Sequence, residues 1–417
     1  MRFATVGKGS NVSFTAVTLD QGIKNVEYKI ATDAYENNAE NDDYNGSTLD
    51  KNKPGSVLVD HLFGENQAND VTTVASGETK ADSDIDKTTN FKIVGVKGEE
   101  SGGGEDPSNP GGNTSDAGRT IINMSRANYA NAVQFDTLNK RQGEMRFSQG
   151  REDGMWVRMR HDDIGKKQSF RLNNTMVEVG YDWLDKADDG EYHTGVALDY
   201  MQGDTDYHNI SGSGELDRIG VWAYRTWLGN DGDYTDMIFK YGHLENDFEL
   251  FAKSTGEKIT GDYDNHVLSV SLEHGKKFKN SESWFIEPQA QLQYSYVTSA
   301  EYKTSQDSEV RLDAIHSLIG RMGIRAGKDL STDDPFTIYA RADIMHEFLG
   351  DQDIYAKDKT GALKVRYENN ETWYSSGVGM TYMPSKDSII YFEGEKVFGA
   401  SNTSSYIVSG GIRVLFK

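Results

Sequence analysis

The chain has 417 residues, including 43 glycines, 6 prolines and no cysteine, and its formal net charge at pH 7 is -22. The length allows more than one domain. The absence of cysteine excludes a disulfide framework and a thiolate metal site, and the acidity argues against a nucleic-acid partner, because phosphate binding needs clustered Lys and Arg. Mean hydropathy is -0.68, and no run of about 18 apolar residues occurs, so we expect no helical membrane span.

The N-terminal zone, residues 1–96, carries short runs of alternating polarity, such as Val26–Ile30 and Phe91–Val94. Turns rich in Asp, Asn and Gly separate these runs, which predicts a β-rich domain. Residues 97–118 are acidic and rich in Gly, Pro and Ser, as is typical of a flexible linker. The segment Met1–Gly7 has no apolar core of a signal peptide, so we expect Met1 to begin a fragment whose upstream part is missing.

A single helix is predicted over residues 119–146, with Ser115 or Asp116 as its cap. Helix-forming residues are frequent and no proline interrupts them. Polar and apolar residues are mixed on every face, which is unusual for a core helix. At about 1.5 Å per residue this helix would be roughly 40 Å long, enough to cross the roughly 30 Å hydrocarbon layer. It is too polar to contact lipid, so we expect it inside a water-lined pore.

Residues 147–417 are predicted to form an antiparallel β-barrel. Strand candidates alternate in polarity and lie near 153–161, 174–184, 191–202, 217–228, 232–244, 262–275, 282–297, 315–328, 335–349, 371–383, 387–397 and 404–416. Short links such as Lys186–Gly190 and Pro384–Lys386 alternate with long polar loops such as Gly203–Leu216, Asn246–Gly261 and Gly350–Asn370. Short turns at one end and long loops at the other are typical of a transmembrane barrel, which in bacterial single-chain proteins has an even number of strands.

Charged residues share one face of these strands, opposite an apolar face. Charges facing lipid would cost about 2–4 kcal/mol each at mid-depth, so we place them in the lumen. The predicted lumen charges are Arg158, Arg160, Glu178, Asp182, Glu287, Arg341, Asp343 and Glu347.

The C-terminal strand has an outward set of residues that alternates with Ser409 and Arg413. This set is Tyr406, Val408, Ile412, Val414 and Phe416. An amphipathic strand that closes with an aromatic residue resembles the final, assembly-directing strand of outer-membrane barrels. The chain differs from that pattern in one respect, since Lys417 follows the aromatic residue.

Several segments together resemble autotransporters. Leu138–Arg146 resembles their helix signature, with Leu138, Asn139, Lys140, Arg141 and Arg146 in the pore helix, and Gly154–His161 resembles their first barrel strand. Further matches are Val179–Asp182, Gly242–Phe248, Trp284–Leu292, His346–Phe348 and Gly399–Phe416. The resemblance covers residues 118–416.

This resemblance implies an all-β fold, a twelve-stranded barrel with an α-helix threaded through its lumen, preceded here by a β-rich passenger fragment. It implies an outer-membrane translocator of type Va secretion that exports its own N-terminal passenger and anchors it, with residues 1–118 exposed at the cell surface. The implied partners are outer-membrane lipid, the barrel-assembly machinery, periplasmic chaperones and the passenger in cis. We expect a monomer without cofactor or enzymatic activity.

The resemblance also directs attention to the pore helix. Lys140, Arg141 and Arg146 are candidates to pair with lumen acids such as Glu178, Asp182, Glu287 or Asp343; the alternative is solvation by pore water, with about 0–1 kcal/mol per pair. Some family members cleave this helix at an Asn-Asn pair before the signature. Here Asp136 and Thr137 occupy that position. An ionised carboxylate is a poor nucleophile for that cyclisation, so we expect helix and barrel to stay joined.

Other functions are less well supported by the sequence. A resident plugged pore, or a barrel that anchors an adhesive module in residues 1–96, would share the same barrel. A barrel hydrolase would need a Ser/His pair on one rim, and no convincing pair is present. The nine His residues are scattered without a His-Glu-x-x-His motif, and acidic loops such as Gly203–Asp206 and Gly350–Asp353 lack full calcium-ligand spacing, so no metal site is predicted.

Overall fold

A computed structural model describes residues 116–150, 153–165, 170–208, 210–251, 258–331, 334–357, 362–399 and 404–416. The β-rich domain predicted over residues 1–96 and most of the linker predicted over 97–118 lie outside the described residues. Among the described residues, no helix has the length and hydropathy needed to cross a bilayer.

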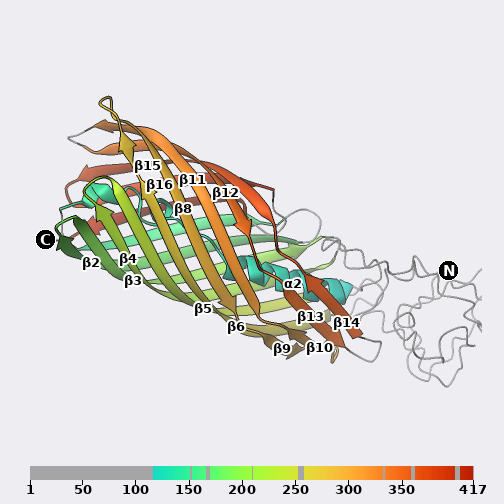
Figure 1. Ribbon diagram of the computed structural model, residues 1–417. Helices are drawn as coiled ribbons and strands as arrows, with labels where there is room; N and C mark the ends of the chain where they lie inside the picture. The colour runs from blue at the N-terminus through green and yellow to red at the C-terminus, as the bar shows by residue number, and fades with distance from the viewer. Residues whose placement is uncertain are drawn as a thin grey trace, which may run out of the picture.

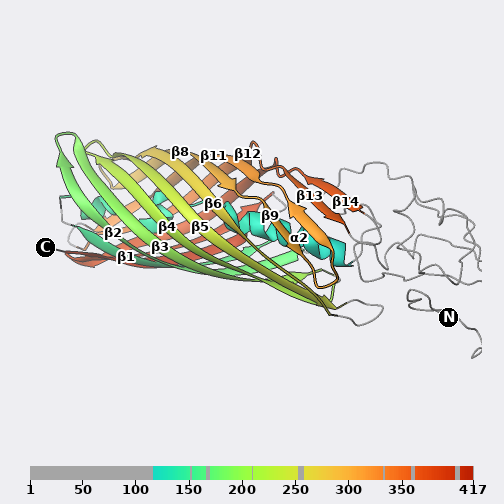
Figure 2. The ribbon, with the colours of Figure 1, turned by 90° about the horizontal axis from the view of Figure 1, so that it is seen from below.

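The described strands form a closed antiparallel barrel, as Figures 1 and 2 show. The main sheet has thirteen strands, and all but the two-residue β7 (Phe278–Lys279) build the barrel wall. The wall strands are β1 (Gly154–Ile164), β2 (Phe170–Ala187), β3 (Gly190–Tyr207), β4 (Gly212–Gly229), β5 (Asp233–Phe251), β6 (Lys258–Lys276), β8 (Trp284–Val297), β11 (Ile315–Ser331), β12 (Phe336–Glu347), β15 (Thr372–Ser385), β16 (Ser388–Phe398) and β17 (Ser404–Leu415). Pairing of β17 with β1 closes the barrel, which confirms the predicted twelve-stranded fold.

Several strands continue further toward the long loops than the sequence predicted. β5 runs to Phe251, so the predicted loop Asn246–Gly261 begins as strand. β3 and β4 likewise occupy much of the predicted loop Gly203–Leu216. In the extension of β5, the outward acids Glu245 and Asp247 alternate with buried residues. Such acids make the strand ends resemble solvated loops, although the period of two persists.

A second sheet, which the sequence pattern did not predict, covers the end of the barrel that carries the long loops. It consists of β9 (Ala300–Lys303), β10 (Glu309–Leu312), β13 (Gln352–Lys357) and β14 (Ala362–Tyr367), in the order β14-β13-β10-β9. We call it the cap sheet, and we call its end of the barrel the loop end and the opposite end the turn end. The predicted loop Gly350–Asn370 therefore contains two strands. Figures 1 and 2 show the cap sheet beside helix α2 (Asp116–Ala132) at the loop end.

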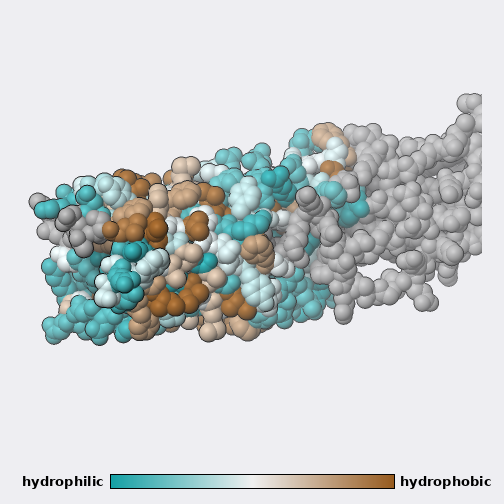
Figure 3. Space-filling model, turned by 90° about the horizontal axis from the view of Figure 1, so that it is seen from above, coloured by the Kyte–Doolittle hydropathy of each residue, from teal (hydrophilic) through white to brown (hydrophobic). Residues whose placement is uncertain are grey.

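The outer face of the wall carries an apolar band. Large exposed side chains such as Leu198, Ile219 and Phe239 lie on neighbouring strands, and brown residues gather over the middle of the barrel in Figure 3, with teal residues toward the turn end. A strand needs only about 9–11 residues to cross a bilayer, whereas β5 and β6 have 19 residues each. The wall therefore extends beyond the apolar band at the loop end.

Inside the barrel, aromatic rings lie over glycines directly opposite them on the next strand. Trp156 opposes Gly180, and Tyr234 opposes Gly275. In both pairs the ring occupies the space that a Cβ atom on the glycine would need. The same arrangement recurs at Tyr224/Gly195, Tyr339/Gly379 and Tyr391/Gly411. Packing against these rings therefore requires glycine at these positions of the lumen.

We predict that Gly275→Val destabilises the barrel by about 1–3 kcal/mol, the usual cost of overpacking. A Cβ atom at position 275 would lie 2.5 Å from Cε1 of Tyr234. The effect is measured by gel electrophoresis without boiling, as the temperature above which the refolded barrel no longer migrates at the mobility of the compact, folded form. Gly394→Val is the matched control, because a Cβ at position 394 meets nothing within 4 Å. Equal midpoints for the two variants would contradict the packing argument.

Candidate functional site: the plugged lumen

The segment that precedes β1 fills the lumen, and we call residues 116–148 the plug. It consists of α2, helix α3 (Leu138–Gln142) and the 3-10 helix η2 (Met145–Ser148). The prediction of one continuous helix over 119–146 was therefore wrong, because α2 ends at Ala132 and residues 133–137 are not helical. The plug lies inside the barrel, with α2 toward the loop end (Figure 1).

Side chains of the barrel wall replace the helical hydrogen bonds that the break removes. Nε2 of Gln293 donates to the carbonyl oxygens of Val133 at 3.3 Å and Gln134 at 3.4 Å. Nε2 of Gln291 donates to the carbonyl oxygen of Asp136 at 2.7 Å. A buried carbonyl without a partner costs free energy, so the glutamines of β8 make the broken conformation possible. The sequence pattern placed these glutamines on the polar face of their strand but gave them no role.

The second helix begins and ends at defined residues. Thr137 caps α3, since its hydroxyl accepts a hydrogen bond from the backbone nitrogen of Lys140. The backbone nitrogen of Leu138 donates to Oε2 of Glu273 at 2.8 Å. Gly143 ends the helix at φ 70°, a left-handed conformation that favours glycine. The start of α3 is therefore fixed by its own cap and by the wall, and its end by a glycine.

The basic residues of the plug are paired with acids on the wall. Nζ of Lys140 lies 2.5 Å from Oε2 of Glu395, and Nη2 of Arg141 donates to both carboxylate oxygens of Asp236, at 2.8 and 2.9 Å. Nη1 of Arg146 lies 2.9 Å from Oε2 of Glu287 and 2.8 Å from Oε1 of Glu144 within the plug.

Only one of these wall acids, Glu287, was predicted from the sequence. Glu395 and Asp236 were missed, although both occupy inward positions of strands that had been predicted, so the same alternation could have identified them. Asn139 of the plug accepts a hydrogen bond at 3.1 Å from Nε2 of Gln289. All five residues predicted for the pore helix lie within the barrel, with Leu138 in an apolar cluster beside Tyr234.

The eight charges predicted for the lumen are all buried on the inner face of the wall: Arg158, Arg160, Glu178, Asp182, Glu287, Arg341, Asp343 and Glu347. Most are paired within the wall. Asp182 binds Arg413 through two hydrogen bonds of 2.5 and 2.7 Å, and Asp343 lies between Arg321 and Arg341 at 2.6 and 2.8 Å. Arg158 is hydrogen-bonded to Glu178. Glu178, Asp182 and Asp343 therefore contact wall arginines rather than the basic residues of the plug.

Two regions of the wall bind the plug directly at the break. Arg158 donates to both carboxylate oxygens of Asp136, at 2.6 and 3.0 Å, and Nη1 of Arg160 lies 3.3 Å from Oδ1 of the same carboxylate. Nη1 of Arg341 donates to the hydroxyl of Thr137 at 3.1 Å. The dipeptide that stands in place of an Asn-Asn pair is therefore held by three arginines of the wall.

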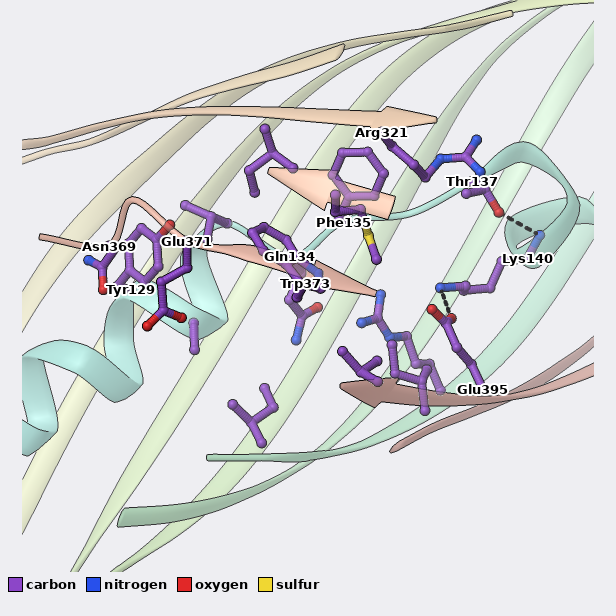
Figure 4. A pocket seen from close by; sticks show the side chains of 18 of the residues that line it. Tyr129, Gln134, Phe135, Thr137, Lys140, Arg321, Asn369, Glu371, Trp373 and Glu395 are labelled. Atoms are coloured by element: carbon purple, nitrogen blue, oxygen red, sulfur yellow. Dashed lines mark hydrogen bonds and ion pairs between the residues drawn. The ribbon is translucent and has the colours of Figure 1, made fainter. Parts of the chain in front are cut away.

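A cavity of about 80 Å³ adjoins the break (Figure 4). Its lining includes Phe135 and Lys140 of the plug and Trp373 and Glu395 of the wall, and Figure 4 shows the ion pair between Lys140 and Glu395 at one side. A water needs about 10–15 Å³ of such space, so the cavity has room for several waters.

The loop end of the lumen is closed by apolar packing between the plug and the cap sheet. Ile122 of α2 belongs to one buried cluster with Val310, Leu312 and Ile354 of the cap sheet. The hydroxyl of Ser125 also donates to Oε1 of Gln352 at 2.6 Å. The cap sheet therefore covers the plug where the plug emerges from the charged part of the lumen.

The C-terminal strand presents its apolar set to the outside, as its alternation indicated. Tyr406, Val408, Ile412, Val414 and Phe416 are exposed on the outer face, while Ser409 and Arg413 are buried. The ring of Phe416 stacks on Tyr181 at 6.2 Å between centroids. The backbone nitrogen of Phe416 donates to the carbonyl oxygen of Asp153 at 2.8 Å, which extends the seam between the first and last strands.

Comparisons with known proteins agree with this architecture. A family model described as the autotransporter beta-domain matches residues 150–395. The chain is 28% identical over 306 residues to the pertactin autotransporter of Bordetella parapertussis, covering 71% of this chain and 32% of that protein. It is 30% identical over 266 residues to the serine protease sat autotransporter of Escherichia coli O6:H1, covering 62% and 20%. The matched part of the chain therefore spans about a third or less of the length of these curated relatives.

Two solved structures are similar in fold. The beta domain of the Bordetella autotransporter BrkA gives a TM-score of 0.54 at 22% identity, covering 64% of this chain and 100% of that chain. The transport unit of the autotransporter AIDA-I from Escherichia coli gives 0.53 at 16% identity, covering 72% and 98%. At these identities the likeness shows the fold.

We predict that Arg141→Met loosens the plug and costs about 3–5 kcal/mol, because Asp236 is left charged and buried. The double variant Arg141→Met/Asp236→Asn is expected to recover most of this stability, because the uncompensated charge is removed. Thermal unfolding in detergent and ion conductance in a planar bilayer measure the effect, and the single variant should conduct more. Lys258→Met is the control, since its pair with Glu249 is exposed and is worth at most about 1 kcal/mol.

We also predict that the chain does not cleave itself between Asp136 and Thr137. Arg158 and Arg160 contact both oxygens of the Asp136 carboxylate, so these oxygens are held in ion pairs and are not free to attack the backbone carbonyl carbon of Asp136. The refolded chain should keep its full mass after prolonged incubation, as judged by mass spectrometry. A barrel fragment that begins at Thr137 would contradict this prediction.

Proposed function

Because this chain belongs to the autotransporter beta-domain family, we propose that it is an outer-membrane translocator that exports its own N-terminal segment and then anchors it. The family places the barrel in the bacterial outer membrane. In this proposal, the residues that precede α2 lie at the cell surface and form the linker and the C-terminal part of the passenger; Asp116, Ala117 and Gly118, predicted as the end of that linker, belong to α2 instead.

The path of the chain through the barrel supports this proposal. α2 lies at the loop end beside the cap sheet, whereas β1 begins at Gly154 at the turn end, where it pairs with Leu415. Residues 116–150 therefore cross the lumen once. The start of α2 therefore lies at the loop end, which in transmembrane barrels of this kind is the extracellular end, and we infer that an exported segment before it would leave the barrel there.

The contacts of the plug support the anchoring part of the proposal. Lys140, Arg141 and Arg146 each bind a wall acid, and the apolar packing of Ile122 closes the loop end. Contacts of both kinds would hold the last part of an exported chain in place. They would also obstruct the pore, since the plug occupies the lumen.

The partners in this proposal follow from the outer surface. The apolar band contacts outer-membrane lipid. Periplasmic chaperones would deliver the unfolded chain, and the barrel-assembly machinery would recognise β17 by its exposed apolar residues. The barrel acts as a monomer with its passenger in cis. The barrel is a transport fold, and we assign it export and anchoring rather than catalysis.

A second candidate is a resident plugged pore or an anchor for an adhesive module. The many contacts between plug and wall also fit a plug that stays in the barrel permanently, as this second candidate requires. The plugged pore differs from the translocator in where the residues before α2 lie, so surface exposure separates these two; an anchored adhesive module would be exposed in the same way as a passenger.

We predict that an epitope tag placed before Met1, behind a signal peptide, reaches the surface of a Gram-negative host. Protease added to intact cells should remove the tag and leave the barrel, which the membrane and its own sheet protect. Immunoblots for the tag and for a barrel peptide give the readout, and a periplasmic protein that stays intact is the control. A protected tag on a folded barrel would support the plugged-pore candidate instead.

A further inference from the structure

Two histidines face each other on the outside of the wall. His243 of β5 and His266 of β6 are directly opposite in register. The backbone nitrogen of His266 donates to the hydroxyl of Thr298, and its carbonyl oxygen accepts from the nitrogen of Thr298. His243 and His266 are therefore a non-hydrogen-bonded pair of the β5–β6 ladder, the kind whose side chains approach most closely.

The distance between the two imidazoles fits one metal ion. Their Nδ1 atoms are 3.2 Å apart. Zinc binds histidine nitrogen at about 2.0–2.1 Å, usually in tetrahedral geometry, which places two nitrogens on the same ion about 3.3 Å apart. Little movement of either ring is then needed for both nitrogens to bind one ion.

Neighbouring side chains orient both rings. Oε1 of Glu245 lies 3.3 Å from Nε2 of His243, and such a contact favours the proton on Nε2 and leaves the lone pair on Nδ1, as in carboxylate–histidine–metal sites. The ring of Tyr241 stacks on His266 at 5.7 Å with an interplanar angle of 19°, and its hydroxyl lies 3.0 Å from Nδ1 of His266, a hydrogen bond that a bound ion would replace. Asp264, directly opposite Glu245, adds negative charge beside the pair, which attracts cations.

We propose that His243 and His266 bind a divalent transition-metal ion on the outer face of the barrel. Imidazole ligands suit Zn²⁺, Cu²⁺ and Ni²⁺ rather than Ca²⁺ or Mg²⁺. In the described part of the chain, no three His, Asp or Glu residues are grouped so as to hold a metal, so water completes the coordination of this two-histidine site. The His243 side chain is 33% exposed, which leaves a path for the ion.

The pair could not be recognised in the sequence because the two histidines are 23 positions apart in the chain and belong to no local motif. Only the register of β5 and β6 brings them together. The bound ion would join two neighbouring strands just beyond the apolar band, on the part of the wall that extends past the membrane.

The test uses the full chain refolded in detergent and carrying no polyhistidine tag. Calorimetric titration with ZnCl₂ should show one dominant site. His243→Gln or His266→Gln should weaken binding at least about tenfold, because loss of a mere outer-shell partner of a metal site already costs about that much. His274→Gln is the control, because His274 lies on the outer face of β6 near the turn end, hydrogen-bonded to Thr235; it should leave the affinity unchanged. Unheated gel mobility verifies that each variant is folded.

Electron spin resonance of bound Cu²⁺ gives an independent readout. The spectrum should show two nitrogen ligands for the unaltered chain and one for either single variant. The proposal is overturned if the unaltered chain binds no Zn²⁺, if both single variants bind as tightly as the unaltered chain, or if the spectrum shows no change in nitrogen ligands.

Discussion

The pairing of charges buried in the lumen governs this structure. A charge buried without a partner costs several kcal/mol, and the cost is recovered only when partner and geometry are both suitable. The wall alone pairs many of its own charges, as Asp182 and Arg413 show. The plug then supplies partners for further acids, including Asp236 and Glu395. Plug and wall are therefore complementary in charge.

The same requirement explains why the plug is not one helix. A helix satisfies its own backbone, whereas the segment 133–137 depends on the wall for hydrogen bonds. Gln291 and Gln293 supply those bonds, and Arg218 donates to the carbonyl oxygen of Asn131 at the end of α2 at 2.9 Å. A cation at that position also interacts favourably with the helix dipole. The break places Asp136 against Arg158, a contact that a continuous helix would not guarantee.

The barrel was predictable because a strand reveals its two faces through a period of two. Charges such as Glu178 and Asp343 could be assigned to the lumen without knowing any contact. Their partners depend on strand register and on the depth of the plug, neither of which is visible in one strand. The break depends on a glutamine 155 positions away, and the cap strands are short and gain stability by packing on α2. The break in the plug and the cap sheet therefore could not be predicted from the local sequence.

Polar pairs define the position of the plug better than an apolar contact would. An apolar surface tolerates sliding, because one methyl group replaces another at similar energy. A shift of the plug by one helical turn, about 5.4 Å, would separate Arg141 from Asp236 and Lys140 from Glu395 together. Each separated partner would then be buried without compensation, at a cost that exceeds what the formed pair contributes. The paired lumen therefore favours one resting position, in which the carboxylate of Asp136 meets Arg158 and α2 lies at the loop end.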